Sequence, residues 1–131
     1  MAGCATLSDD ADLYEVYRSY TDSVSVNNVK EKAPDYLTSR MLSAMNLENP
    51  LVTGEFVVFD RYFEREVNHF ESVKGDVGCL SVNGFNKNEE PITLNIEYHH
   101  TDDWRIDYVH VDLKESPSDF QRKISCPLDR F

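Results

Sequence analysis

The sequence predicts an α+β domain in which N-terminal helices pack on one face of a curved antiparallel sheet. Two observations predict this fold class. Apolar residues recur at the spacing of a helix in the first part of the chain, and after Gly75 they alternate with polar residues as in strands. Helices followed by a run of strands are typical of α+β domains. With 131 residues and no long linker or internal repeat, the chain is expected to form a single domain over residues 12–131, preceded by a short tether at 1–11.

The composition excludes several classes of protein. Seven Phe, seven Tyr and 40% apolar residues are too many for a disordered chain. A formal net charge of -11 argues against nucleic acid as a partner, because phosphate binding needs a basic surface. No apolar run approaches the roughly 18 residues of a membrane-spanning helix.

Three helices are expected in the first 45 residues. Ser8, Asp9 and Asp10 offer capping oxygens for the first helix, whose apolar stripe comprises Leu13, Val16, Tyr17, Tyr20 and Val24. A second, shorter helix is expected to start after Ser25 and to be interrupted at Pro34. The third helix is expected over residues 36–45.

The middle of the chain gives a mixed pattern. Residues 46–54 are expected to be a loop, and 55–59 a strand or irregular. The range 60–71 is assigned as a helix from the spacing of Phe59, Phe63, Val67 and Phe70. Its aromatic and valine content would also suit a strand, so that alternative stays open.

The last half of the chain predicts three strands in series. Residues 77–85 form the first, and a polar hairpin loop follows at 86–91. Strict alternation predicts a half-buried strand over 92–98. A turn at 99–103 then leads into the last strand, 104–113.

The last strand changes parity along its length. Trp104, Ile106 and Tyr108 alternate, but Val109 continues the apolar pattern without a gap. This change predicts a β-bulge at Tyr108–Val109. Strand parity also predicts that Asp107 points away from Ile106, towards solvent.

The first residues resemble the end of a bacterial lipobox, Leu-Ala-Gly-Cys, with Met1 where the Leu would stand before Ala2-Gly3-Cys4. In that class the chain is cut before the cysteine, which then carries diacylglycerol and an acylated amine. Two or more acyl chains give stable membrane anchoring. Ala5 after the cysteine implies sorting to the outer membrane. We therefore expect the mature form of a lipoprotein; the alternative is an ordinary start with an incidental cysteine.

If Cys4 is the anchor, Cys79 and Cys126 remain as an even pair in an oxidising periplasm. A disulfide between them would contribute about 4 kcal/mol to stability on the chain-entropy model. It would also hold the C-terminal segment, 116–131. The alternative is two unrelated thiols, with Cys79 simply buried in its strand.

The order of elements resembles the NTF2-like (cystatin-like cone) superfamily. The matching motif is Leu94-Asn95-Ile96-Glu97-Tyr98, a turn, and then Trp104-Arg105-Ile106-Asp107-Tyr108-Val109. The resemblance covers 12–113 by topology and 92–111 by motif. It implies a cone-shaped pocket between the helices and the sheet, and the superfamily includes isomerases, dehydratases, cyclases and many non-catalytic members. The candidate pocket-lining residues are Tyr14, Tyr17, Tyr20, Phe63, Tyr98, Trp104, Tyr108 and His110.

No catalytic motif is present. Asp107, His110 and His69 are the candidates for a general base, and Tyr14, Tyr17 and Tyr20 could donate hydrogen bonds to an oxyanion. Asp107 and His110 are expected to face solvent and the tyrosines to belong to the core. We therefore assign no catalytic residue.

No metal site or cofactor is predicted. His99-His100 and Asp102-Asp103 are metal-ligating residue types, but adjacent strand residues point to opposite faces, and a polar hairpin turn explains them better. The charged residues Glu64, Glu66 and Glu71, interleaved with Arg61 and Arg65, are expected to form a solvated helix face.

These observations predict a non-catalytic, lipid-anchored envelope lipoprotein that binds a protein partner or a small ligand. It would face the periplasm, bound to the membrane through Cys4, and could form a homodimer through its sheet face. One alternative is an NTF2-like pocket enzyme. Another is a periplasmic immunity or inhibitor protein whose negative charge, -11 in total, faces a basic toxin or hydrolase.

Overall fold

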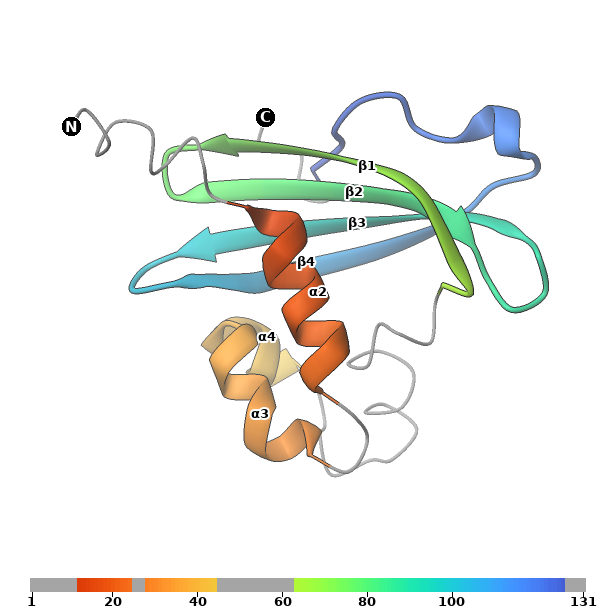
Figure 1. The fold of residues 1–131 in the computed structure, drawn as a ribbon. Coiled ribbons are helices and arrows are strands. Elements are labelled where there is room, and N and C mark those ends of the chain that lie inside the picture. The colour runs from red at the N-terminus through yellow and green to blue at the C-terminus, as the bar shows by residue number, and fades with distance from the viewer. Residues whose placement is uncertain (1–11, 25–27, 45–62, 127–131) are drawn as a thin grey trace.

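The computed structural model describes residues 12–24, 28–44 and 63–126. Within them, helices come first and a four-stranded antiparallel sheet follows, which confirms the α+β class (Figure 1). Several sequence features lie outside the described residues, namely Cys4 with the tether at 1–11, Ser8–Asp10, Ser25, the loop at 46–54 and the stretch at 55–59.

Helix α2, Leu13–Ser23, lies across the sheet with Leu13, Tyr17 and Tyr20 buried. The Asp12 side chain caps it by accepting a hydrogen bond from the Glu15 backbone N–H at 3.0 Å, a role the sequence suggested for residues 8–10. No helix in the described ranges is long and apolar enough to cross a membrane.

Helix α3, Val29–Tyr36, continues through Pro34, so the predicted interruption there is wrong. The helix ends because Leu37 forms a parallel bridge with Ile106 at the edge of the sheet. Helix α4, Ser39–Ala44, therefore starts three residues later than predicted. The Thr38 hydroxyl accepts a hydrogen bond from the Met41 N–H and so fixes the first turn of α4.

The sheet is a meander in the order β1-β2-β3-β4. Strand β1 spans Arg65–Lys74, so the helix predicted over 60–71 is wrong for its described residues from 65 onward. Pairing with β2 overrides the helical spacing. Val67 is an extra residue in the β1 register and is 49% exposed, so it is not part of a buried helical stripe.

The other three strands are confirmed. Strand β2 spans Val77–Phe85, β3 spans Pro91–His100 and β4 spans Trp104–Leu113. The predicted bulge in β4 is also present, but it is centred on Asp107 rather than on Tyr108–Val109.

Both faces of the central strands are buried. One face packs against the helices and forms the apolar core, with Leu80, Val82, Leu94, Ile96, Tyr98 and Ile106. On the other face, Ser81, Asn83, Thr93, Asn95 and Glu97 are 0–4% exposed. Strand β3 is thus buried on both sides and not half-buried as its alternation predicted.

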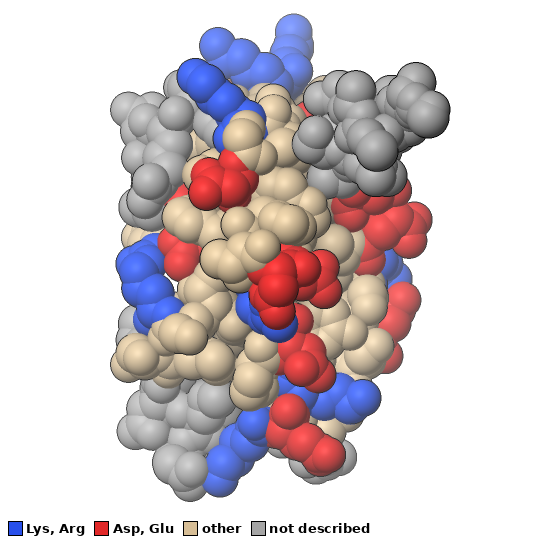
Figure 2. All heavy atoms as spheres, turned by 90° about the vertical axis from the view of Figure 1, so that its left-hand side faces the viewer, with Lys and Arg blue, Asp and Glu red and all other residues tan. Residues whose placement is uncertain are grey.

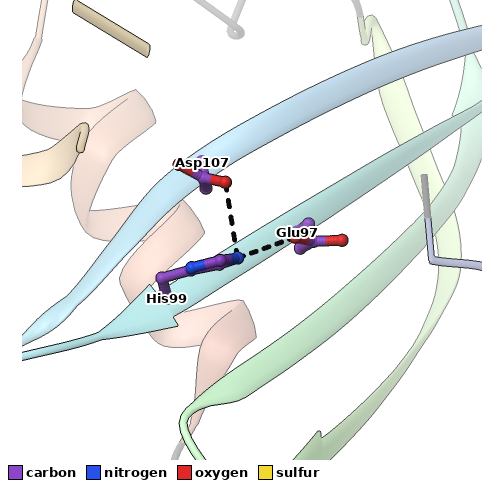
Figure 3. A group of neighbouring side chains, drawn as sticks. All are labelled: Glu97, His99 and Asp107. Atoms are coloured by element: carbon purple, nitrogen blue, oxygen red, sulfur yellow. Dashed lines mark hydrogen bonds and ion pairs between the residues drawn. The ribbon is translucent and has the colours of Figure 1, made fainter. Parts of the chain in front are cut away.

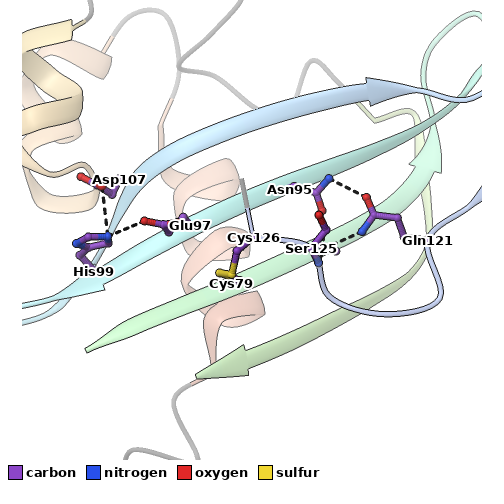
Figure 4. Close-up of a disulfide and its surroundings, with 9 residues drawn as sticks. Cys79, Asn95, Glu97, His99, Asp107, Gln121, Ser125 and Cys126 are labelled. Atoms are coloured by element: carbon purple, nitrogen blue, oxygen red, sulfur yellow. Dashed lines mark hydrogen bonds and ion pairs between the residues drawn. A yellow bond between two sulfur atoms is a disulfide. The ribbon is translucent and has the colours of Figure 1, made fainter. Parts of the chain in front are cut away.

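The C-terminal segment covers part of the polar face (Figures 1 and 4). The Gln121 side chain accepts a hydrogen bond from Asn95 at 2.8 Å and donates one to Ser81 at 3.2 Å, and the Gln121 carbonyl accepts one from Asn83 at 2.8 Å. These bonds satisfy buried amides that would otherwise be costly.

The predicted disulfide is confirmed. Cys79 on β2 and Cys126 are bonded with a Cα–Cα distance of 5.5 Å, across 47 positions of the sequence. The bond joins the C-terminal segment to the polar face of the sheet (Figure 4).

We expect the Cys79→Ala/Cys126→Ala double variant to lose about 4 kcal/mol of unfolding free energy, because the disulfide restricts the unfolded chain. Urea denaturation at neutral pH measures this. Cys4→Ser is the control and should leave the midpoint unchanged. A loss below about 1 kcal/mol in the double variant would contradict the role assigned to the bond.

Candidate functional site

The space between α2 and the sheet is filled by side chains. Tyr17, Tyr20 and Tyr98 are 0–1% exposed and pack with the apolar face of the strands. Tyr20 and Tyr98, candidates for lining a cone-shaped pocket, therefore occupy the core, whereas Tyr17 also lines a pocket between α2 and the start of β1. Further pockets lie around the outside of the packed layer.

One pocket lined by described residues has a volume of about 710 Å³ and is open to solvent. It lies where the α3–α4 connection meets the β3–β4 end of the sheet, and we call it the α4–β4 pocket. Its lining residues are Pro34, Leu37, Thr38, Ser39, Arg40, Leu42, His99, Thr101, Asp102, Arg105 and Asp107.

The β4 bulge places a carboxylate in this pocket. Glu97 of β3 pairs with Tyr108 and Tyr98 pairs with Ile106, so Asp107 has no partner in the register. Asp107 and Tyr108 thus both lie opposite Glu97, and Asp107, on the face of Glu97 and His99, is 5% exposed. Asp107 points away from Ile106 as strand parity predicted, but the prediction that it faces solvent is wrong, because Thr38 and Arg40 at the start of α4 cover it.

Asp107 is held by the start of α4. The Thr38 hydroxyl donates a hydrogen bond to its Oδ1 at 2.7 Å. Arg40 donates to both carboxylate oxygens at 3.0–3.2 Å and to the Asp107 carbonyl at 2.9 Å. Burial would raise the pKa of Asp107, but the hydrogen bonds from Arg40 and Thr38 and the nearby positive charges outweigh it and hold that pKa below its usual value.

His99 connects Asp107 to a second buried carboxylate (Figure 3). His99 Nε2 lies 2.7 Å from Glu97 Oε2 and 3.3 Å from Asp107 Oδ2. Glu97 is 0% exposed, whereas the His99 side chain is 29% exposed and also lines the α4–β4 pocket. These three residues, the Glu97–His99–Asp107 cluster, lie on the sheet face opposite α2.

Glu97 was not singled out from the sequence. The sequence does indicate that Glu97 and His99 share a face, because they are two positions apart on one strand. It does not indicate that Asp107 lies beside them, because that depends on how β4 pairs with β3. The neighbouring His100 ring packs edge-on against Trp104, with ring centroids 4.9 Å apart.

The remaining sequence candidates are dispersed over the molecule. Phe63, Tyr14 and Tyr17 contribute to a pocket of about 410 Å³ beside β1, and Trp104 lines a separate pocket next to α2. Tyr108 and His110 are exposed on β4, and Tyr20 and Tyr98 are in the core. His69 is exposed, and its ring stacks on that of Tyr14 at 3.8 Å.

Charged residues of β1 bind α2 and do not form a solvated helix face. Glu71 accepts hydrogen bonds from the backbone N–H groups of Leu13 and Tyr14 at the start of α2. Glu66 accepts one from the Tyr14 hydroxyl at 2.5 Å and one from Arg18 at 3.2 Å. Burial and the Glu66 carboxylate raise the pKa of Tyr14 to about 12.

The charges are mixed on the end of the molecule that carries the β1–β2 and β3–β4 turns. Figure 2 shows acidic side chains gathered in the middle and to one side of this face, with Lys and Arg side chains between and around them. Near the α4–β4 pocket, Arg105 pairs with Asp102 and donates a hydrogen bond to the Pro34 carbonyl at 3.1 Å. The pocket therefore presents both signs of charge.

We expect Asp107→Asn to lower the free energy of unfolding by about 1–3 kcal/mol, because an amide cannot replace the charge that Arg40 and Thr38 bind. The matched control is Glu89→Gln, which removes an exposed carboxylate 3.5 Å from Arg65 and should cost about 0.5 kcal/mol or less. Urea denaturation measures both. Equal effects of the two variants would contradict the buried position of Asp107.

The hydrogen bond of Tyr14 should depend on pH. Because the folded pKa lies near 12 and the unfolded value near about 10, the bond stabilises fully below about pH 10, and this contribution is lost as pH rises towards 12. The ultraviolet titration difference between the wild type and Tyr14→Phe should have its midpoint near 12. A midpoint near about 10 would show that Tyr14 is not bound to Glu66.

Comparisons with models of protein families, with curated proteins and with solved structures find no match to this chain. The function is therefore inferred from the α4–β4 pocket, the cluster beside it and the disulfide.

Proposed function

We propose that this chain is a non-catalytic, lipid-anchored lipoprotein of the bacterial cell envelope that binds a small ligand or a segment of a protein partner in the α4–β4 pocket. The observation that carries the proposal is the placement of this pocket. It lies outside a filled core, has a volume of about 710 Å³ and brings Arg40, Arg105 and Asp102 to one opening. A concave site in which polar groups converge on one opening is typical of ligand recognition.

The chemistry of the pocket favours binding over catalysis. A general base works best when its pKa lies near the working pH. Arg40 and Thr38 hold the pKa of Asp107 below its usual value, and both nearby carboxylates already contact His99 Nε2. The ionisable side chains beside the pocket therefore bind one another, and none of them is poised to take a proton from a substrate.

The pocket also indicates a class of ligand. Arg40 and Arg105 already pair with Asp107 and Asp102, and the remaining N–H groups of their guanidiniums suit a carboxylate or another planar anion. Leu37, Leu42 and Pro34 add apolar surface beside them. A small molecule or peptide segment that combines an anionic group with an apolar part would match this lining.

The proposed compartment rests on the cysteines. The Cys79–Cys126 disulfide suits an oxidising environment such as the periplasm. The lipobox resemblance at Cys4 supplies the anchor, and Ala5 favours the outer membrane. Helices followed by an antiparallel meander are consistent with an NTF2-like relationship, which we include in the proposal.

Lipidation can be tested on the protein isolated from its source cells. We expect it to enter the detergent phase on Triton X-114 partition, with an N-terminal peptide that begins at an acylated Cys4. Mass spectrometry of that peptide is the decisive readout. A water-soluble protein with an unmodified thiol at Cys4 would contradict the anchor.

Ligand binding can be tested by NMR with small carboxylates that carry an apolar group. Shift changes should gather around Thr38, Arg40 and Arg105. Ser39→Trp should abolish them by filling the opening, whereas Ser19→Trp, beside a different pocket, should not. Shifts that gather elsewhere, or that persist in Ser39→Trp, would contradict the assignment of the pocket.

A further inference from the structure

We propose that Glu97, His99 and Asp107 form a binding site for one divalent transition-metal ion of the Zn²⁺ type, reached from the α4–β4 pocket. This inference goes beyond the proposed function and depends on neither the lipid anchor nor the ligand. It also revises the expectation from the sequence, which considered the adjacent pair His99-His100 and not residues on two strands.

The donor atoms converge on one point. One atom from each residue lies within 4.8 Å of the other two, and His99 Nε2 is 2.7 Å and 3.3 Å from the carboxylate oxygens of Glu97 and Asp107. Tetrahedral Zn²⁺ with bonds of about 2.0–2.2 Å requires donors about 3.4 Å apart. Small side-chain movements would bring the three donors to that spacing.

The protein backbone fixes this convergence. Glu97 and His99 are alternate residues of β3 and share a face, and the β4 bulge presents Asp107 to the same face. Metal sites built on regular strands are more precise than sites built on loops. The two carboxylates are 0% and 5% exposed, so a cation between them would offset the cost of burying two negative charges.

Asp107 already has the supporting groups that metal-binding carboxylates usually have. Thr38 donates to its Oδ1, and Arg40 donates to both oxygens. Such hydrogen bonds orient a ligand and are typical of the outer shell of metal sites. Oδ2, the oxygen nearest His99 Nε2, shares the Arg40 Nε hydrogen bond with Oδ1, so a metal at Oδ2 would replace that shared bond while the Arg40 Nη2 and Thr38 bonds remain.

The donor set selects the type of metal. One imidazole with two carboxylates suits Zn²⁺, Fe²⁺ or Ni²⁺, whereas Mg²⁺ and Ca²⁺ prefer oxygen ligands alone. Three protein ligands also leave a fourth position, which water or an anion could fill. Because the His99 side chain is 29% exposed and lines the α4–β4 pocket, that position is accessible from solvent.

The test is calorimetric titration of Zn²⁺ into the metal-free, disulfide-intact protein, with Mg²⁺ in parallel. We expect one Zn²⁺ site and no comparable binding of Mg²⁺. His99→Gln should weaken Zn²⁺ binding by more than the roughly 10- to 100-fold that follows loss of a supporting group. The matched control is His100→Gln, the adjacent residue whose ring faces Trp104, and it should bind as the wild type does.

Two further measurements test the metal site if the His99→Gln variant fails to fold. Glu97→Gln retains the shape of the side chain and should also weaken Zn²⁺ binding. In the wild type, Zn²⁺ should shift the imidazole NMR signals of His99 and leave those of the other three histidines in place. No Zn²⁺ binding, or binding that His99→Gln and His100→Gln affect equally, would overturn the proposal. The pocket would then still stand as a ligand site.

Discussion

The fold and the candidate site both depend on one irregularity, the extra residue in β4 at Asp107. There Asp107 and Tyr108 share one partner, Glu97, and Asp107 provides the buried anion that the start of α4 binds. With it, Arg40 and Thr38 fasten the α3–α4 connection to the edge of the sheet. The same residue reaches His99 on the neighbouring strand. A single bulge thus positions a helix, closes one side of a pocket and assembles a cluster of ionisable groups.

The sheet is buried on both faces by two different kinds of contact. The helix side is apolar and excludes water by packing tyrosines and aliphatic side chains. The opposite side is polar, and there Gln121 and its neighbours satisfy Ser81, Asn83 and Asn95. The disulfide keeps the C-terminal segment in place over this side. The Glu97–His99–Asp107 cluster lies on the same polar face, so it occupies a region where buried polar groups are already accommodated (Figure 4).

The sequence predicted those parts of the fold in which local pattern and tertiary environment agree. The alternation from Ile92 to Tyr98 predicts a strand correctly, because its apolar side faces the core. The spacing from Phe63 to Phe70 predicts a helix wrongly, because pairing with β2 decides the conformation of β1. At the site, strand parity predicted the face of Asp107 correctly, but not its burial. Asp107 is buried because Thr38 and Arg40, about 70 residues earlier in the chain, pack against it, and no local pattern of β4 reveals that contact.

The most direct test of this account is a double-mutant cycle between Arg40 and Asp107, with unfolding free energies measured for Arg40→Met, Asp107→Asn and the double variant. If the bulge places Asp107 against Arg40, the two substitutions should be strongly non-additive, with a coupling energy of about 1–3 kcal/mol. Additive effects would mean that the two side chains do not meet. The bulge would then not position the carboxylate as described, and both the pocket and the cluster would lose their basis.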